Sequence, residues 1–385
     1  MIIVSVFILL ATVKNICSGE SQIPGQYIVF FNEDSDKVAA QQRLFARAEQ
    51  QQESQSPQIL TELRQGLAVD GLTEEVAKEW ENDSAVAKVV PNIKLTVANM
   101  AQSNPPSWGL DRIDQERPFL DNQYSYTQTG AGVQVYIFDT GIRTTHEDFG
   151  GRASCGLNVI RGEDCEDGFG HGTHVAGTVG GRSFGVAKDV ELIAVKVLSS
   201  TGEGSLANAL QGLEYVRDQK LANPSTPMVI NMSLAGEYIE AFNEALEETV
   251  ADGIVVVVAA GNFFRNACRY SPAAAKSVIS VGATARYDMM GLFSNYGKCV
   301  DIFAPGARII SAGHTSDDAV DRKSGTSMAC PHVAGAAAMY LQAHPDWTPA
   351  QVWEAMRSQS IGKVKTYLLS LVGTPRRLLQ TGLIA

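Results

Sequence analysis

Five short apolar runs constrain the fold of this chain more than any other feature. They are VQVYIFDT, ELIAVKVL, MVINMSL, IVVVVAA and VISVGAT, and they lie between residues 133 and 284. Strands that are apolar on both faces and rich in β-branched residues are typical of a buried parallel sheet. The runs therefore predict a sheet that is covered on both sides.

Stretches with helical periodicity alternate with these runs. They are HGTHVAGTVGG, ANALQGLEYVRDQ, AFNEALEETVADG and, after the last run, SMACPHVAGAAAMYLQAH. Strands that alternate with helices predict an α/β domain with a doubly wound, mostly parallel sheet. In such sheets, functional groups gather beyond the carboxyl ends of the strands.

A chain of 385 residues exceeds one average domain. Upstream of the α/β pattern we expect a strand at 26–32, a helix from 39 that runs into a loop by 55, a helix at 73–82 and a strand at 88–97. These elements predict a small β-α-β-like α+β unit of under about 80 residues, whose own core would be marginally stable. The Pro pair in 99–107 is typical of a linker.

The amino terminus begins with an apolar run up to Thr12, which Lys14 and two small residues, Ser18 and Gly19, follow. The run is too short to span a bilayer and indicates a secretory signal at 1–19, although a buried strand is an alternative. Five cysteines remain beyond Cys17. In an oxidising compartment they allow two bridges, with three possible connectivities, and one free thiol.

The net charge of −11 and a pI near 5.1 bear on the partners of the chain. Phosphate binding needs a concentrated basic face, and the Lys and Arg residues here do not cluster. We therefore expect a soluble protein that binds neither nucleic acid nor membrane. The signal at 1–19 adds the expectation that it is secreted, and we expect a monomer.

Two polar residues stand where strands of the expected sheet give way to loops or helices. Asp139 ends VQVYIFD, and His171 lies between two glycines before a helix. Each has an ordinary alternative: an Asp after a strand is often a cap or turn residue, and His171 with His174 could bind a metal. The Glu of a zinc-peptidase helix is absent, so we favour His171 as a general base and His174 as a packed residue.

Ser327 and Asn262 complete a set of groups suited to nucleophilic catalysis. Ser327 opens a small-residue helix, where a Ser is usually a cap, but where its N–H could also bind an oxyanion. Asn262 follows IVVVVAAG and is either a turn residue or a second oxyanion donor. Together the four residues supply a nucleophile, a base, an orienting carboxylate and an anion donor.

Several longer strings resemble those of subtilisin-type proteases, and most closely the proteinase K branch. They are VYIFDTGI, GHGTHVAGTVGG, FGVAKDVELIAVKVL, INMSLAG, VVVVAAGN, CRYSPA, FSNYGKCVDIFAPG, SGTSMACPHVAG and the closing GTPRRLL. The resemblance extends from about Trp108 to Gly382. It implies a serine endopeptidase with Asp139, His171 and Ser327 as its triad and Asn262 in its oxyanion hole.

The resemblance also implies the walls of the substrate site. The primary specificity pocket corresponds to Ser233, Leu234, Ala235 and Gly236 together with Ala259, Ala260 and Gly261, and the edge strand that pairs with substrate to Gly202, Glu203 and Gly204. The resemblance implies a broad preference for apolar residues. Ala235 stands where many relatives have Gly, and its methyl group could narrow the entrance of the pocket.

Structural calcium and disulfides follow from the same resemblance. One calcium site would use Asp301 with backbone oxygens of Lys276 and Val278, and a second Asp111, Asp114 and Gln115. Cys268 and Cys299 match bridged positions, which leaves Cys155 with Cys165 as the second pair and Cys330 as a buried free thiol.

Residues 20–100 resemble the inhibitory propeptide of the family, which implies an intramolecular inhibitor ahead of a catalytic domain at 101–385 that acts on protein or peptide substrates. Cleavage is expected between 97 and 102. Two other functions stay open: a catalytically silent protein with a permanently bound propeptide, and a convertase selective for basic sites. The convertase is disfavoured because no β-rich domain follows the catalytic unit and the pocket segments carry no acidic cluster, although Glu203 lies at their edge.

Overall fold

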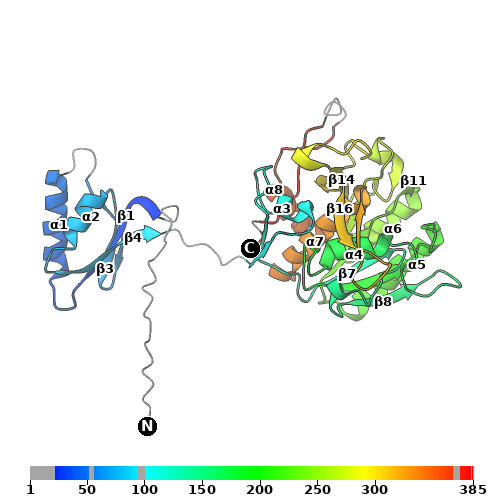
Figure 1. The fold of residues 1–385 in the computed structure, drawn as a ribbon, viewed down its shortest axis with the longest axis horizontal. Helices are drawn as coiled ribbons and strands as arrows, with labels where there is room; N and C mark the ends of the chain where they lie inside the picture. Colours follow the sequence, from blue (N-terminus) through cyan, green and yellow to red (C-terminus); the bar gives the residue numbers. More distant parts are fainter. Residues whose placement is uncertain (1–21, 52–55, 94–99, 367–372, 383, 385) are drawn as a thin grey trace, which may run out of the picture. The chain divides into compact units, whose positions relative to one another are not determined.

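The computed structural model describes residues 22–51, 56–93, 100–366, 373–382 and 384. The chain divides into two compact units, residues 1–97 and 98–385 (Figure 1). The expected signal segment at 1–19 lies outside the described residues, as does the 97–99 part of the expected cleavage region.

The amino-terminal unit is a four-stranded antiparallel sheet with two helices. Its elements are β1 (Gln22–Phe31), α1 (Lys37–Gln51), β2 (Gln58–Leu63), β3 (Gly66–Asp70), α2 (Glu74–Trp80) and β4 (Val86–Ile93). The strand order is β2-β3-β1-β4, and every pairing is antiparallel. Leu44, Val69 and Trp80 belong to the core between the sheet and the helices.

The expectation of a simple β-α-β unit is therefore wrong in one respect, because the β2–β3 hairpin was not predicted. All six residues of β2 are exposed at the edge of the sheet, so the strand carries no alternation of apolar and polar residues that a sequence pattern could reveal.

The larger unit contains a seven-stranded sheet in the order β15-β14-β12-β10-β7-β9-β8. Every pairing in it is parallel. The strands are β7 (Gln134–Asp139), β8 (Ala153–Asn158), β9 (Glu191–Lys196), β10 (Met228–Met232), β12 (Val255–Ala259), β14 (Ile279–Thr284) and β15 (Ile302–Pro305). All five apolar runs of the sequence form strands of this sheet.

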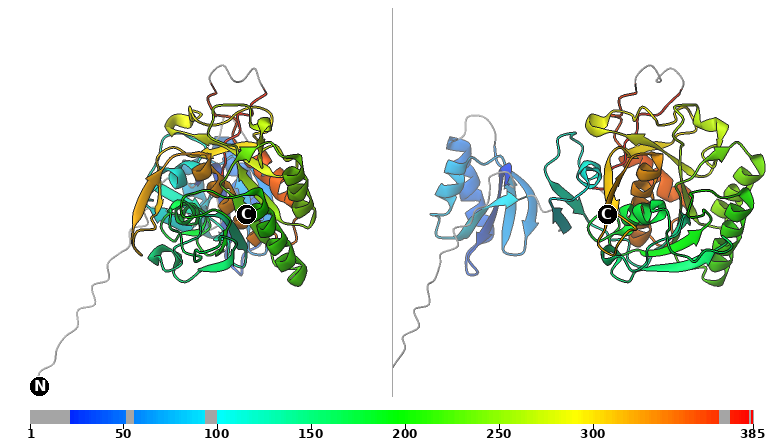
Figure 2. Two further views of the ribbon diagram at one scale, coloured as in Figure 1. Left: turned by 90° about the vertical axis from the view of Figure 1, so that its right-hand side faces the viewer. Right: turned by 45° about the vertical axis from the view of Figure 1, so that its right-hand side comes forward.

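Helices cover both faces of this sheet, as Figures 1 and 2 show. They are α3 (Trp108–Ile113), α4 (His171–Gly180), α5 (Leu206–Ala222), α6 (Glu240–Ala251), α7 (Thr326–Ala343) and α8 (Pro349–Gln359). Alternate residues of one strand face different cores: Val135 and Ile137 pack with α4 and α7, whereas Tyr136 and Phe138 pack with α5 and α6. The predicted doubly wound α/β fold is thus confirmed.

Three short antiparallel pairs lie outside the main sheet. They are β5 (Met100–Ser103) with β6 (Gln123–Tyr126), β11 (Gly236–Glu237) with β13 (Tyr270–Ser271), and β16 (Ile309–Ala312) with β17 (Val320–Lys323). Of these pairs, β11–β13 lies at the site described below, where Gly236, Glu237 and Ser271 line the cavity.

Candidate active site

Asp139 is the last residue of β7 and is completely buried. Its two carboxylate oxygens lie 2.7 and 2.8 Å from Nδ1 of His171. The backbone N–H of Thr140 donates to Oδ1 of Asp139 at 2.8 Å. A buried carboxylate needs such partners to remain charged, and here they come from the adjacent turn and the facing imidazole.

His171 is the first residue of α4, and glycines allow the chain to approach it closely. Gly170 has a φ of 84°, and a Cβ on Gly172 would lie 2.1 Å from the carbonyl oxygen of Gly141. Burial lowers the pKa of His171, but the charge of Asp139 and its hydrogen bond raise that pKa more, so the net shift is upward. A base positioned in this way is pre-oriented for proton transfer.

His174 does not take part in this arrangement. It is fully buried, its Nε2 lies 3.1 Å from the carbonyl oxygen of Ile309, and burial lowers its pKa to about 4. The side chain is a packed residue of α4.

Ser327 is the second residue of α7, at the helix end where backbone N–H groups have no acceptor within the helix. Its hydroxyl donates to the carbonyl oxygen of Ser233 at 3.1 Å, and Oγ of Ser233 donates back to the Ser327 carbonyl at 3.0 Å. No hydrogen bond joins Ser327 to His171 in the described parts of the chain.

Asn262 follows β12, and its Oδ1 accepts from the N–H and the hydroxyl of Thr326 at 2.8 and 3.0 Å. Among the described residues no hydrogen bond uses the Asn262 amide nitrogen, which can therefore donate to another acceptor. A Cβ added to Gly325 would lie 3.3 Å from Nδ2 of Asn262 and 3.6 Å from the Ser327 nitrogen, so both donors border the same space. That space suits a developing oxyanion.

A cavity of about 580 Å³ opens beside His171. Of the residues expected to line the substrate site, Gly202, Glu203, Gly204, Ser233, Leu234, Ala235 and Gly236 do so. The expected edge strand is part of a short hairpin, because Leu198 and Gly204 form an antiparallel bridge.

The other expected wall, Ala259 to Gly261, does not line this cavity. Ala259 and Ala260 are fully buried, and Gly261 donates its N–H to the hydroxyl of Thr326 at 3.1 Å. This segment supports α7 at the site.

Several residues at the site were not expected from the sequence. The cavity is also lined by Phe169, Leu198, Leu206, Ala209, Glu237, Ile239 and Phe242. Most are apolar residues of helices and loops, which in a sequence cannot be distinguished from core residues.

Asp167 is a further residue near the site that the sequence did not predict. Its carboxylate is buried and accepts from the Thr140 hydroxyl at 2.7 Å and from the N–H groups of Gly170 and Thr173 at 2.7 and 2.8 Å. Burial raises the pKa of Asp167, but these hydrogen bonds lower it more. The only sequence signal was its place four residues before His171.

The structure joins Cys155 to Cys165 and Cys268 to Cys299, the two pairs that the resemblance implied. Cys330 is a buried free thiol, and burial raises its pKa. A thiol in this environment is not poised to ionise.

The expected calcium ligands lie in two regions of the larger unit. Near α3, Oδ1 of Asp114 is buried and has no hydrogen-bond partner among the described residues, and burial raises the pKa of this carboxyl to about 7. Both oxygens of Asp111 accept backbone N–H groups, at 3.1 and 2.9 Å, and Gln115 directs its Nε2 toward the carbonyls of Arg117 and Phe119. The unpartnered oxygen of Asp114 fits a cation.

Asp301 immediately precedes β15, while Lys276 and Val278 lie just before the neighbouring strand β14. Oδ2 of Asp301 accepts the Ser280 N–H at 2.9 Å, and burial raises the pKa of the carboxyl. Within the described ranges no three His, Cys, Asp or Glu side chains cluster as a metal ion needs. Calcium at either region would therefore depend on backbone or water oxygens as well.

A doubly wound parallel sheet with an aspartate, a histidine and a serine beyond its carboxyl edge is characteristic of serine hydrolases. The model of the Subtilase family of peptidases matches residues 130–374. The chain belongs to this family and is a subtilisin-type serine endopeptidase, so the resemblance drawn from the sequence is confirmed.

Similar proteins agree with this assignment. The chain is 44% identical over 352 residues to "Extracellular serine proteinase" of Thermus sp. (strain Rt41A), which covers 87% of this chain and 84% of that one. It is 42% identical over 311 residues to "Alkaline serine exoprotease A" of Vibrio alginolyticus, covering 80% of this chain but only 55% of the relative. The crystal structure of a cold adapted subtilisin-like serine proteinase has a TM-score of 0.67 and 43% identity, covering 71% of this chain and 97% of the other.

None of the helices in the described ranges is long and apolar enough to cross a membrane.

Proposed function

We propose that the chain hydrolyses peptide bonds with Ser327 as nucleophile, His171 as general base and Asp139 as the carboxylate that orients the imidazole. The observation that carries this proposal is the contact of both Asp139 oxygens with Nδ1 of His171, at 2.7 and 2.8 Å. A carboxylate against Nδ1 favours the neutral tautomer with its proton on Nδ1, in which Nε2 can accept a proton.

In the proposed reaction, the Ser327 hydroxyl leaves the carbonyl of Ser233 and turns toward Nε2 of His171. Oγ then attacks the carbonyl carbon of the scissile bond while its proton passes to Nε2. His171 returns that proton to the leaving amine, which breaks the C–N bond. Water then releases the acyl group by the same proton transfers in reverse.

The negative charge on the attacked oxygen is stabilised by Nδ2 of Asn262 and the N–H of Ser327. The N–H and the hydroxyl of Thr326 both donate to Oδ1 of Asn262. They hold the side-chain amide so that Nδ2 is oriented before the negative charge develops. Preorganised donors of this kind contribute most of their stabilisation in the transition state.

The proposed substrate is an extended protein segment that pairs with Gly202, Glu203 and Gly204. Apolar residues such as Leu198, Leu206 and Phe242 line the cavity, which supports a broad apolar preference. Ala235 is exposed and lines the cavity, and we propose that its methyl group narrows the entrance.

We further propose that residues 1–19 are a secretory signal, 20–100 an inhibitory propeptide and 101–385 the catalytic domain of a secreted, monomeric enzyme with structural calcium. The division into two units at Val97 supports the second boundary. An intramolecular first cut would gain from high effective concentration.

The test compares the wild-type chain with Ser327→Ala in a host that lacks other proteases. Wild type should cleave unstructured protein and begin near Ala101 after secretion, whereas Ser327→Ala should be inactive and keep the residues from about Gln22 onward. If Ser327→Ala were cut at the same bond, self-processing would be wrong. If it cleaved substrate, the assignment of the nucleophile would fail as well.

A further inference from the structure

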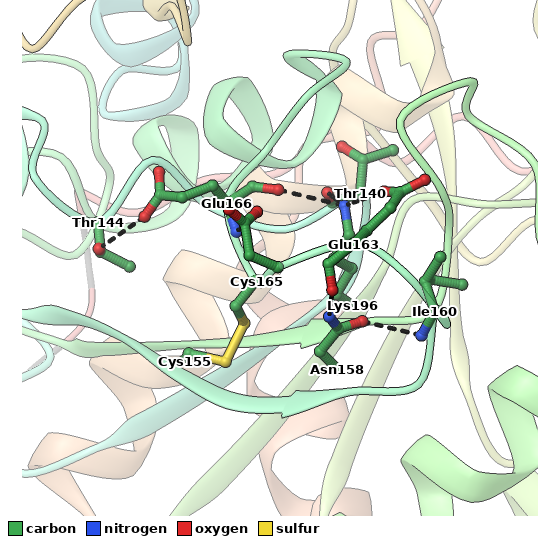
Figure 3. Close-up of a disulfide and its surroundings, with 10 residues drawn as sticks. Thr140, Thr144, Cys155, Asn158, Ile160, Glu163, Cys165, Glu166 and Lys196 are labelled. Carbon is green, nitrogen blue, oxygen red and sulfur yellow. Dashed lines mark hydrogen bonds and ion pairs between the residues drawn. A yellow bond between two sulfur atoms is a disulfide. The ribbon is translucent and has the colours of Figure 1, made fainter.

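Lys196 ends β9, directly beside Asp139 at the end of β7, and its side chain is completely buried. Its ammonium group contacts the carbonyl oxygens of Thr140 and Glu166, at 2.6 and 3.2 Å, and Oε2 of Glu163, at 3.1 Å (Figure 3). An ammonium group has three donors, and a buried one is costly unless they are matched. The three acceptors thus hold Lys196 in one position.

The first contact leads to the triad. Thr140 is the residue whose N–H donates to Oδ1 of Asp139, and its hydroxyl oxygen accepts the N–H of Gly172, next to His171, at 3.0 Å. By holding the carbonyl of Thr140, Lys196 restrains the residue whose N–H and hydroxyl make these two contacts.

The Glu163 contact leads to the substrate cavity. The carboxylate of Glu163 accepts the Ser200 N–H at 2.9 and 3.1 Å and the Ser200 hydroxyl at 3.0 Å. Ser200 lies in the turn between Leu198 and Gly202, which both line the cavity. Lys196 and Glu163 therefore connect the catalytic carboxylate with one wall of the substrate site.

The segment that carries Glu163 and Glu166 has little freedom to move. The Cys155–Cys165 disulfide joins it to β8, and Nδ2 of Asn158 donates to the Glu163 carbonyl at 2.7 Å (Figure 3). A Cβ on Gly141 would lie 2.4 Å from the Cys165 carbonyl oxygen, so the segment packs directly against the turn after Asp139. A displacement at Lys196 would be transmitted to that turn.

We propose that Lys196 is a positioning residue for the peptidase reaction. It holds the turn after Asp139 through Thr140, and through Glu163 it holds the Ser200 turn that borders the bound substrate. This inference rests on the proposed function, since it assigns Lys196 to the orientation of groups in that same site. Lys196 touches neither the substrate nor the reacting atoms.

Lys188 provides a matched control, because it is also buried and also has three acceptors. Its Nζ contacts Oε1 of Gln102 and the carbonyls of Arg182 and Gly185, at 2.7, 3.0 and 3.1 Å. None of these groups lines the cavity or contacts Asp139 or His171. Replacing either lysine by Met leaves three buried acceptors without their donor, so a purely structural role predicts similar effects of the two changes.

The experiment measures kcat and KM per active site, with sites counted by a serine-directed phosphonylating reagent. Lys196→Met should lower kcat per titrated site about 10- to 100-fold, because small displacements of catalytic groups have effects of this size. Glu163→Gln should raise KM about threefold to tenfold, the effect of one weakened hydrogen bond. Lys188→Met should keep kcat per titrated site within about twofold, even where it lowers thermal stability. Lys196→Arg, which keeps the charge and donors, should be faster than Lys196→Met.

The positioning role is overturned if titrated sites of Lys196→Met turn over as fast as those of wild type, or if Lys188→Met slows turnover equally. If neither Lys196 variant folds, the KM of Glu163→Gln becomes the test, and an unchanged KM would reject the proposal.

Wild-type enzyme is treated with the same phosphonylating reagent. If Ser327 of the wild type were not labelled, the proposed function itself would be contradicted.

Discussion

At the scale of single residues, the protonation state of His171 governs the proposed reaction. The Asp139 carboxylate holds the pKa of His171 above its ordinary value of about 6.5, although burial opposes the shift. The proposed general base is the neutral imidazole. Because the pKa of His171 is raised, the protonated and inactive form persists to higher pH. The acid limb of kcat/KM should therefore have its midpoint above about 6.5.

Asp139→Asn should lower kcat by about 10⁴-fold, because it removes the charge that orients and stabilises the imidazolium. It should also move the acid limb to lower pH, since burial alone lowers the pKa of His171. The measurement is kcat/KM from about pH 5 to about pH 9. An acid limb at the same pH in both proteins would show that Asp139 does not set this pKa.

Asn262 offers a second test at this scale. Asn262→Ala should lower kcat about 10²- to 10³-fold with nearly unchanged KM, because the lost hydrogen bond forms mainly in the transition state. Asn262→Asp keeps an oxygen for Thr326 but loses the amide donor, so it should be at least as slow. A large rise in KM with normal kcat would remove Asn262 from the oxyanion role.

The sequence predicted the residues of the proposed triad because each lies in a specific motif at the end of a strand or the start of a helix. It did not predict Asp167 or Lys196. Their importance depends on which backbone carbonyls and amides the fold brings near them, and a buried Lys or capping Asp has no distinctive pattern of its own. Ala259 to Gly261 were placed in the pocket wall by resemblance, whereas the side chains beside the cavity come from other elements.

At the scale of elements, α7 determines where Ser327 lies, and it packs closely against α4. A Cβ on Gly335 would lie 2.7 Å from Cβ of Val186 and 3.0 Å from the carbonyl oxygen of Val179. The clash should therefore destabilise Gly335→Ala by about 1–3 kcal/mol. The higher helix propensity of Ala should offset part of this loss.

Gly362→Ala is the control, because a Cβ there meets no atom within 4 Å. Thermal unfolding should show a lower midpoint for Gly335→Ala and little change for Gly362→Ala. Equal midpoints would mean that the contact between α4 and α7 can relax.

The sequence predicted the central strands well and the edges poorly. β7, β9, β10, β12 and β14 are buried on both faces, and so they are continuous apolar runs. β8 contains Ser154, Gly156 and Asn158 and lies at the edge, while β15 at the other edge has only four residues. α8 was not predicted although Thr348 and Gln351 form a capping box, because only Val352 and Met356 of this helix are buried and its apolar periodicity is weak.

At the scale of the whole molecule, the Asp114 carboxyl links the stability of the folded chain to pH when calcium is absent, and to calcium when the ion is bound. The carboxyl has a pKa of about 7 in the folded chain and about 3.9 when unfolded. With chelator, the folded state therefore binds the extra proton, and stability should fall as pH rises from about 4 to about 7 and then level off. Calcium should reverse that fall by neutralising the carboxylate.

Asp114→Asn separates this effect from general damage. In chelator above about pH 7 the variant should unfold at a higher temperature than wild type, because it has no charge to bury. With calcium the order should invert, since only wild type gains a ligand. If calcium leaves the unfolding of wild type unchanged, or if Asp114→Asn is the less stable protein in chelator, the site near α3 is wrong.

The claim on which the account depends is that Ser327 is a nucleophile activated by His171. Reaction of the mature protein with a serine-directed phosphonylating reagent, followed by peptide mapping, tests it most directly. We expect one adduct, on Ser327, with labelling greatly slowed in His171→Ala and absent in Ser327→Ala. An adduct on another residue, or peptide hydrolysis that persists with Ser327 unlabelled, would contradict the account.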